Sequence, residues 1–182
     1  MNMKKKLIVA LIAVLSIFVL AACSGAGEQG AAPEPETADT VTTASIVADE
    51  EAFINAVSAD GSWIVATLND LTFEEAITVE GKFYDDGDSE NDLYRKIAAY
   101  AQDDQRNITD RYTITAPEMI IKSPNTRFQA GTFVGDIIVE VNGFTLYDAV
   151  VEGNIYFANE EYQKSAEITN DSEVTGVIEV QN

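Results

Sequence analysis

A repeat of 18 residues constrains this chain more than any other feature of its sequence. Residues 133–139 (FVGDIIV) are followed 18 positions on by residues 151–157 (VEGNIYF), and residues 174–180 (VTGVIEV) repeat the pattern 23 positions later. Each segment reads apolar-x-Gly-x-aliphatic-x-apolar. Moving back 18 positions from Ile137 and Val139 gives Met119 and Ile121, again apolar at alternate positions. A short fixed period is typical of a solenoid, whose repeats bury their apolar faces by stacking on one another.

The repeat therefore predicts an all-β fold, a parallel β-helix (solenoid) of about five or six coils. Strict alternation in the coil that begins at Thr132 sends one set of side chains inward. This inward set is Phe133, Ile137, Val139, Phe144, Leu146 and Ala149. The corresponding outward set is Asp136, Glu140, Thr145, Tyr147 and Asp148.

An outward stripe of apolar residues recurs on one side of the predicted coils. It consists of Val134, Ile138, Val150 and Tyr156. Because exposed apolar stripes are usually covered, we expect either the inserted segment 82–111 or a partner protein to lie over it, and the insertion is the more economical cover.

Segments on the N-terminal side interrupt or precede the coils. Residues 48–58 predict a short helix, with Asp49 as N-cap and an apolar face that would cap the first coil. Strand-like sequence runs from Trp63 to Gly81. Residues 82–111 break the pattern and predict a side lobe or long hairpin; within them, residues 93–101 fit a helix or a strand equally well.

The first residues of the chain predict the cellular location of the protein. Three lysines at positions 4–6 precede a 14-residue apolar run and the sequence Leu-Ala-Ala-Cys ending at Cys23, which is a secretory signal peptide (residues 1–22) too short to span a membrane. Its end resembles a bacterial lipobox, and this resemblance implies that Cys23 is lipidated and becomes the new N-terminus. Residues 23–47, rich in Gly, Ala, Glu, Pro and Thr, predict a disordered acidic tether. The folded domain is then residues 48–182, held at the extracytoplasmic face of the cell membrane.

The charge of the chain excludes one class of partner. It carries 31 acidic and 11 basic residues, a net charge of −20. Loss of the three lysines with the signal peptide makes the remaining chain more acidic still. A surface of this sign repels nucleic acid and anionic headgroups, so we expect no nucleic-acid binding and a solvated acidic surface.

The side-chain inventory argues against most catalysis. The chain has no histidine, no Gly-rich phosphate loop and only one cysteine, the predicted lipid attachment site Cys23. We therefore expect no enzyme activity, no catalytic residues and no cofactor. The remaining enzymatic alternative is a carbohydrate-active enzyme on a β-helix, for which Asp136, Glu140 and Glu152 are the carboxylates to test.

The acidic turn at residues 85–92 is the one candidate metal site. Its carboxylates are hard ligands of the kind that calcium takes, but their spacing matches neither known calcium-loop pattern. A solvated turn is the favoured alternative, and the sequence leaves metal binding open.

The repeat resembles a known family. Gly135-Asp136-Ile137 and Gly153-Asn154-Ile155, set 18 residues apart near the end of a small acidic chain, resemble the bactofilin-like polymer-forming domains. The resemblance covers residues 112–180 and implies a right-handed solenoid that assembles end to end. The chain as a whole looks like a surface lipoprotein of a Gram-positive bacterium.

Three functions fit these observations. The first is a non-catalytic structural or interaction module, self-assembling through its C-terminal coil. The second is a lipoprotein that binds wall polymer or a cation through the insertion. The third is the carbohydrate-active enzyme.

Overall fold

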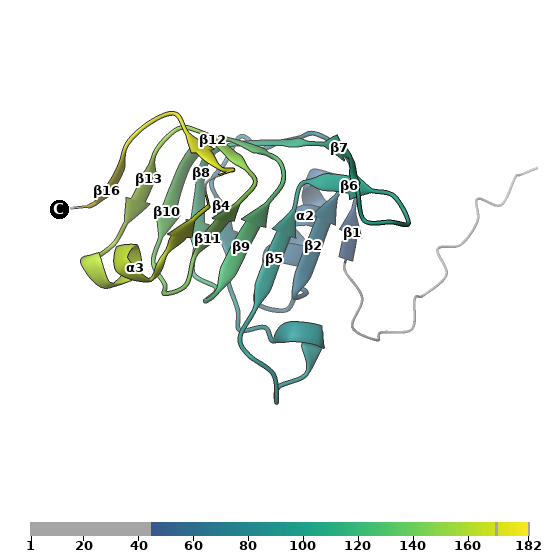
Figure 1. The fold of residues 1–182 in the computed structure, drawn as a ribbon, viewed down its shortest axis with the longest axis horizontal. Helices are drawn as coiled ribbons and strands as arrows, with labels where there is room; N and C mark the ends of the chain where they lie inside the picture. Colours follow the sequence, from purple (N-terminus) through teal and green to yellow (C-terminus); the bar gives the residue numbers. More distant parts are fainter. Residues whose placement is uncertain (1–44, 170, 182) are drawn as a thin grey trace, which may run out of the picture. The chain divides into compact units, whose positions relative to one another are not determined.

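The computed structural model describes residues 45–169 and 171–181. The predicted signal peptide, Cys23 and the tether up to residue 44 lie outside these described residues. The described part is predominantly β, and its two large sheets are built from parallel strands, as the sequence predicts (Figure 1).

The first sheet, called sheet A here, has six strands. All of its neighbouring strands pair in parallel. In spatial order they are β1 (Ser45–Val47), β2 (Ile64–Thr67), β5 (Arg95–Ala98), β9 (Thr126–Gln129), β11 (Thr145–Tyr147) and β14 (Glu167–Ile168). The spatial order is also the chain order, which means that each strand of sheet A lies beside the next one that the chain forms.

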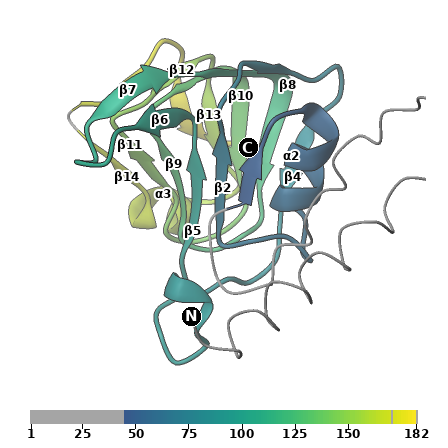
Figure 2. The same ribbon diagram turned by 90° about the vertical axis from the view of Figure 1, so that its right-hand side faces the viewer.

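The second sheet, sheet B, faces sheet A (Figure 2). Two of its strands are long, and the others come as collinear pairs of short strands. In spatial order they are β3 (Leu71–Thr72) with β4 (Ile77–Val79), β8 (Thr113–Ile121), β10 (Thr132–Val139), β12 (Val150–Glu152) with β13 (Ile155–Phe157), and β15 (Glu173–Val174) with β16 (Ile178–Val180). The chain alternates between the two sheets, and each pass adds one layer.

The predicted register is observed strand by strand. Ile137 pairs with Met119 on one side and with Ile155 on the other, each 18 positions away. Ile155 pairs in turn with Ile178, 23 positions on. Because side chains alternate along a strand, this register places equivalent apolar residues of successive layers on the same face.

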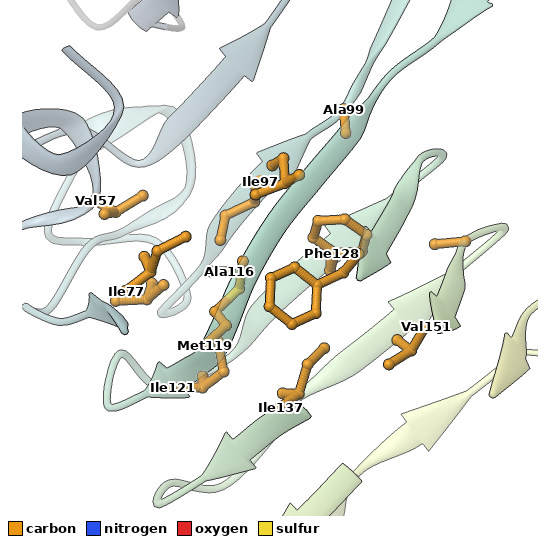
Figure 3. Close-up of a cluster of buried hydrophobic side chains, with 14 of the residues drawn as sticks. Val57, Ile77, Ile97, Ala99, Ala116, Met119, Ile121, Phe128, Ile137 and Val151 are labelled. Atoms are coloured by element: carbon orange, nitrogen blue, oxygen red, sulfur yellow. The ribbon is translucent and has the colours of Figure 1, made fainter. Parts of the chain in front are cut away.

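The core lies between the sheets. All six residues predicted to point inward in the coil from Thr132 are at most 1% exposed, and none of the predicted outward residues is buried. Phe128 of sheet A meets Phe133 of sheet B edge to face, with ring centroids 6.4 Å apart. Figure 3 shows Ile97 and Phe128 turned toward the sheet B residues Met119 and Ile137. Burial of each such side chain contributes about 1.5–3 kcal/mol.

The glycines of the repeat are explained by the close stacking of successive layers. A Cβ on Gly153 would lie 2.0 Å from the carbonyl oxygen of Gly135, and one on Gly135 would lie 1.9 Å from that of Ala116. Gly135 also has φ of 136°, a conformation that side chains disfavour. Glycine therefore recurs at this corner of the repeat because a side chain would collide with the backbone of the preceding layer.

The predicted N-terminal helix is present as α2 (Glu50–Val57). Asp49 caps it by accepting a 2.8 Å hydrogen bond from the backbone N–H of Ala52. Phe53 and Val57 are fully buried, and the helix packs against β1, β2 and β4, so it covers the first layers. Strand β1 precedes it and lies within the range predicted as tether, so the last three residues of that range, 45–47, belong to sheet A.

The predicted side lobe at residues 82–111 is wrong as a single unit. Strand β5 lies in the middle of sheet A, between β2 and β9. Two separate excursions flank it: a loop at residues 82–94 containing the short 3₁₀ helix η1 (Asp85–Gly87), and an antiparallel hairpin of β6 (Tyr100–Gln102) and β7 (Ile108–Arg111). The ambiguous segment 93–101 is therefore strand, and the charged Arg95 at an inward position concealed this in the sequence.

Both the 82–94 loop and the β6–β7 hairpin lie on the sheet A side of the molecule, because each lines a cavity together with residues of β5, β9 or β11. The apolar stripe Val134, Ile138, Val150 and Tyr156 lies on sheet B. The expected cover of the stripe by the insertion is therefore wrong. The stripe residues are only partly exposed, because they neighbour one another along and across the strands; Ile138, for example, pairs with both Ile120 and Tyr156.

Among the residues that the structure describes, Arg95 is the one charged side chain that is buried. Its guanidinium donates hydrogen bonds to the carbonyl oxygens of Ala56 (2.6 Å), Ser58 (3.3 Å) and Glu80, and lies 4.1 Å from the ring centre of Phe83. Burial lowers its pKa to about 10, so it remains charged at neutral pH. Arg95, which belongs to β5, thus links the end of α2 to Glu80, the residue after β4.

We predict that replacing Arg95 by leucine lowers the free energy of unfolding by about 2–4 kcal/mol, because several buried carbonyls lose their donor. Urea unfolding followed by circular dichroism measures this loss. Arg111→Leu is the matched control: Arg111 forms an exposed ion pair with Asp148, and we expect its loss to cost less than about 1 kcal/mol. Equal effects of the two substitutions would contradict the structural role of Arg95.

Candidate functional site

The outer face of sheet A gathers cationic and aromatic side chains. Lys96 of β5 and Arg127 of β9 are register partners, and Arg127 is in turn the partner of Thr145 on β11. All three side chains alternate with buried neighbours and so point away from the core. In a chain with a net charge of −20, two adjacent cations on one sheet face are unusual.

A cavity of about 590 Å³ lies over this face. The loop at residues 82–94 forms one wall, held closed by pairing of Tyr84 with Leu93 and by a 3.0 Å hydrogen bond from the Asp85 N–H to the Asp92 carbonyl oxygen. Strands β9 and β11 form the other wall. The side chains that matter most below are Tyr84, Asp92, Tyr94, Asn125, Arg127 and Thr145.

Arg127 sits between two tyrosine rings. Its guanidinium carbon lies 5.6 Å from the ring centre of Tyr94 and 5.0 Å from that of Tyr147, distances at which a cation is attracted to the ring face. Within residues 45–169 and 171–181, no carboxylate lies within ion-pair distance of this guanidinium, and its buried Nε has no hydrogen-bond partner. Arg127 therefore has no carboxylate that would compete with a ligand for its guanidinium.

Tyr94 forms the second side of the cavity. Its ring packs at a tilt on Trp63, with centroids 6.1 Å apart. Burial raises the pKa of the Tyr94 phenol, while the nearby Arg127 charge acts in the opposite direction. The phenol is therefore neutral at physiological pH and presents both an apolar ring and a hydrogen-bonding hydroxyl.

A second cavity, of about 410 Å³, lies over the same sheet beside the β6–β7 hairpin. Lys96, Tyr100 and Gln129 belong to its lining, and the Lys96 ammonium donates to the Tyr100 hydroxyl at 3.3 Å. A third, more apolar hollow of about 350 Å³ lies toward β1, beside the exposed Ile46 and Leu68. The cavities thus follow one another across the outer face of sheet A.

The carboxylates proposed for a carbohydrate-active enzyme lie elsewhere, on sheet B or at its corners. Asp136 accepts hydrogen bonds from the Asn154 backbone N–H (2.8 Å) and side-chain amide (2.9 Å), and the Asn154 side-chain oxygen Oδ1 accepts from the Val177 N–H (3.0 Å). Asp136 therefore holds successive corners together. Glu140 is exposed and 3.9 Å from Lys122, Glu152 is exposed, and none of the three lines the cavities over sheet A.

The acidic turn at residues 85–92 is exposed and satisfies part of its own hydrogen bonding, since Asp88 accepts from the Glu90 N–H at 3.0 Å. In the part of the chain that the structure describes, no three Asp, Glu, Cys or His side chains are grouped so as to hold a metal ion. The turn contributes to the site in another way, because Asp92 reaches the main cavity.

Sequence reasoning missed the cavity residues Tyr94 and Arg127 and the neighbouring Tyr147. Two signals pointed toward them: mixed charge is concentrated between Lys82 and Arg127, and Tyr147 belongs to the predicted outward set. These side chains come together only because the loop at residues 82–94 folds back over β9. The sequence has no periodic pattern that predicts this fold of the loop.

Comparison with known proteins adds no relative. Among the described residues, no helix has the length and apolar character needed to cross a membrane. The chain matches no family model, and neither the curated proteins nor the solved structures gave a significant match.

Proposed function

We propose that this protein is a lipoprotein held by Cys23 at the extracytoplasmic face of the cell membrane. Its folded part is a right-handed β-solenoid that acts as a non-catalytic interaction module and self-associates through its last layer. The support comes from the parallel register of the layers, from the signal sequence, and above all from the difference between the two ends of the stack.

The C-terminal end presents open strand edges. Among the described residues, β14, β15 and β16 each pair with a strand on one side only, so their other edge offers backbone donors and acceptors. Val177 and Ile178 are 49% and 42% exposed there. Open edges with exposed aliphatic side chains favour pairing with another chain.

The N-terminal end is different, because α2 packs against β1, β2 and β4 and buries Phe53. A second copy cannot stack both of its sheets on that end without displacing the helix, although β1 leaves one edge of sheet A unpaired there. Head-to-tail polymerisation, which the bactofilin-like resemblance implies, is therefore disfavoured. A closed two-fold dimer that pairs the C-terminal layers of two copies satisfies the same edges.

We predict that the chain sediments as a dimer at micromolar concentration, and that Ile178→Lys weakens the dimer at least tenfold by placing a charge in the interface. Ile54→Lys is the matched control, because Ile54 is a similarly exposed isoleucine (41%) on α2, at the capped end. Sedimentation velocity distinguishes the outcomes. A wild-type monomer, open-ended polymers, or equal effects of the two lysines would contradict the proposal.

Membrane attachment is tested at Cys23. In a bacterial host, we predict that the wild-type protein partitions into the detergent phase of Triton X-114, whereas Cys23→Ala enters the aqueous phase, since covalent acyl chains supply the membrane affinity. Ser24→Ala controls for changes beside the cleavage site. Retention of Cys23→Ala in the detergent phase, without intact signal peptide, would show that another anchor is used.

A further inference from the structure

We propose that the outer face of sheet A binds a neutral polysaccharide chain, with the cavity between the 82–94 loop and strands β9 and β11 as its principal subsite. This inference concerns a different surface from the C-terminal edges and does not depend on self-association.

The size and closure of the main cavity suit a small polar ligand. Its volume of about 590 Å³ falls within the range of ligand pockets, roughly 300–1,000 Å³. Its walls are fixed: β9 and β11 are in the sheet, and the loop is closed by the Tyr84–Leu93 pairing and by the Asn125 amide, which donates to the Leu93 carbonyl oxygen at 2.8 Å. A ligand therefore meets a largely preformed site.

The chemistry of the lining fits a sugar. Sugar hydroxyl groups both donate and accept hydrogen bonds, and the C–H face of a sugar ring stacks on aromatic rings. The cavity offers donors on Arg127, acceptors on Asp92, and the aromatic rings of Tyr84 and Tyr94. Arg127 is the central group, because it lines the cavity and lacks an ion-pair partner within the described residues.

The charge around the cavity favours a neutral ligand over an acidic one. Asp92 lines the cavity itself, and the same loop carries Asp85, Asp86 and Asp88 within seven positions of it. The chain as a whole has a net charge of −20. Within the main cavity, the single guanidinium of Arg127 can orient a hydroxyl or ether oxygen, whereas the carboxylates of the loop would repel an acidic group bound there. The second cavity has a different charge, because Lys96 and Arg106 both line it.

The arrangement of the cavities favours a polymer over a single sugar. The main cavity includes Arg127, and the second includes Lys96 and Gln129. Lys96 is the register partner of Arg127, and Gln129 lies two residues along the same strand, so the two cavities neighbour each other on β5 and β9. Tyr147, 42% exposed, stands beside Arg127 as a further stacking surface. A chain of several sugar units can lie across both cavities.

The test is calorimetric titration of the full-length protein with cellohexaose, maltohexaose, fully N-acetylated chitohexaose and the acidic hexagalacturonate. We expect at least one neutral hexasaccharide to bind at least tenfold more tightly than its own monosaccharide. Tyr94→Ala and Arg127→Ala should each weaken that binding at least tenfold. Thr145→Trp fills the cavity while keeping its charged groups and its tyrosines, and it should abolish binding even if the other variants prove unstable.

Matched controls lie on sheet B: Tyr156→Ala and Lys122→Ala should leave affinity within twofold. Ile178→Lys should also bind normally, which separates this proposal from self-association. The proposal is overturned if no neutral hexasaccharide binds, if only hexagalacturonate binds, or if the sheet B variants lose as much affinity as the cavity variants. Circular dichroism and urea midpoints confirm that each variant is folded.

Discussion

The structure depends on one constraint: the apolar residues of each layer are buried only when the next layer stacks on them in register. Ile137 lies between Met119 and Ile155 in sheet B, and neither neighbour is close in sequence. A layer on its own leaves both of its strand edges and its apolar side chains exposed to water. The stability of each layer therefore depends on its contacts with the layers on either side. With a single cysteine, outside the described residues, no internal disulfide can replace this packing.

Two devices keep the layers in step. At the corner of sheet B, the backbone of Gly153 approaches that of Gly135 so closely that any side chain would collide, and the Asp136–Asn154 hydrogen bonds link the same turns. At the N-terminal end, Arg95 joins the last turn of α2 to the residues after β4 through backbone carbonyls. The glycine contact sets the register because no side chain fits between the two backbones. The Arg95 hydrogen bonds hold α2 in place because they give partners to buried carbonyl oxygens.

The sequence predicts the regular part of this fold because the 18-residue period and the alternation of apolar residues follow directly from which side chains are buried. The inward set from Phe133 to Ala149, the pairing of Ile137 with Ile155 and the cap at Asp49 all follow from such patterns. The structure of the insertion does not follow from them. Ile97 and Phe128 are register partners although they are 31 positions apart, because the β6–β7 hairpin lengthens the repeat at this point. Arg95 misled further, because a charge at an inward position is recognisable only once its carbonyl acceptors are in place.

The candidate site was harder to predict for a related reason. Outward residues are not constrained by packing, so Tyr94 and Arg127 carry no periodic signal, and their meeting requires the loop at 82–94 to close over β9. The carboxylates that the sequence did suggest, such as Asp136, turn out to support the stack. The regular core thus leaves its two outer faces free to differ, and the outer face of sheet A carries cavities with mixed charge.

The most direct measurement of the central claim is a set of backbone nuclear Overhauser effects in isotope-labelled protein. In-register stacking predicts interstrand contacts joining residues 137–139 to 155–157, and a second series joining 155–157 to 178–180. If these segments instead show antiparallel contacts, or contacts shifted by one residue, the layers do not stack as described, and the burial pattern, the corner glycines and the neighbouring cavities lose their common explanation.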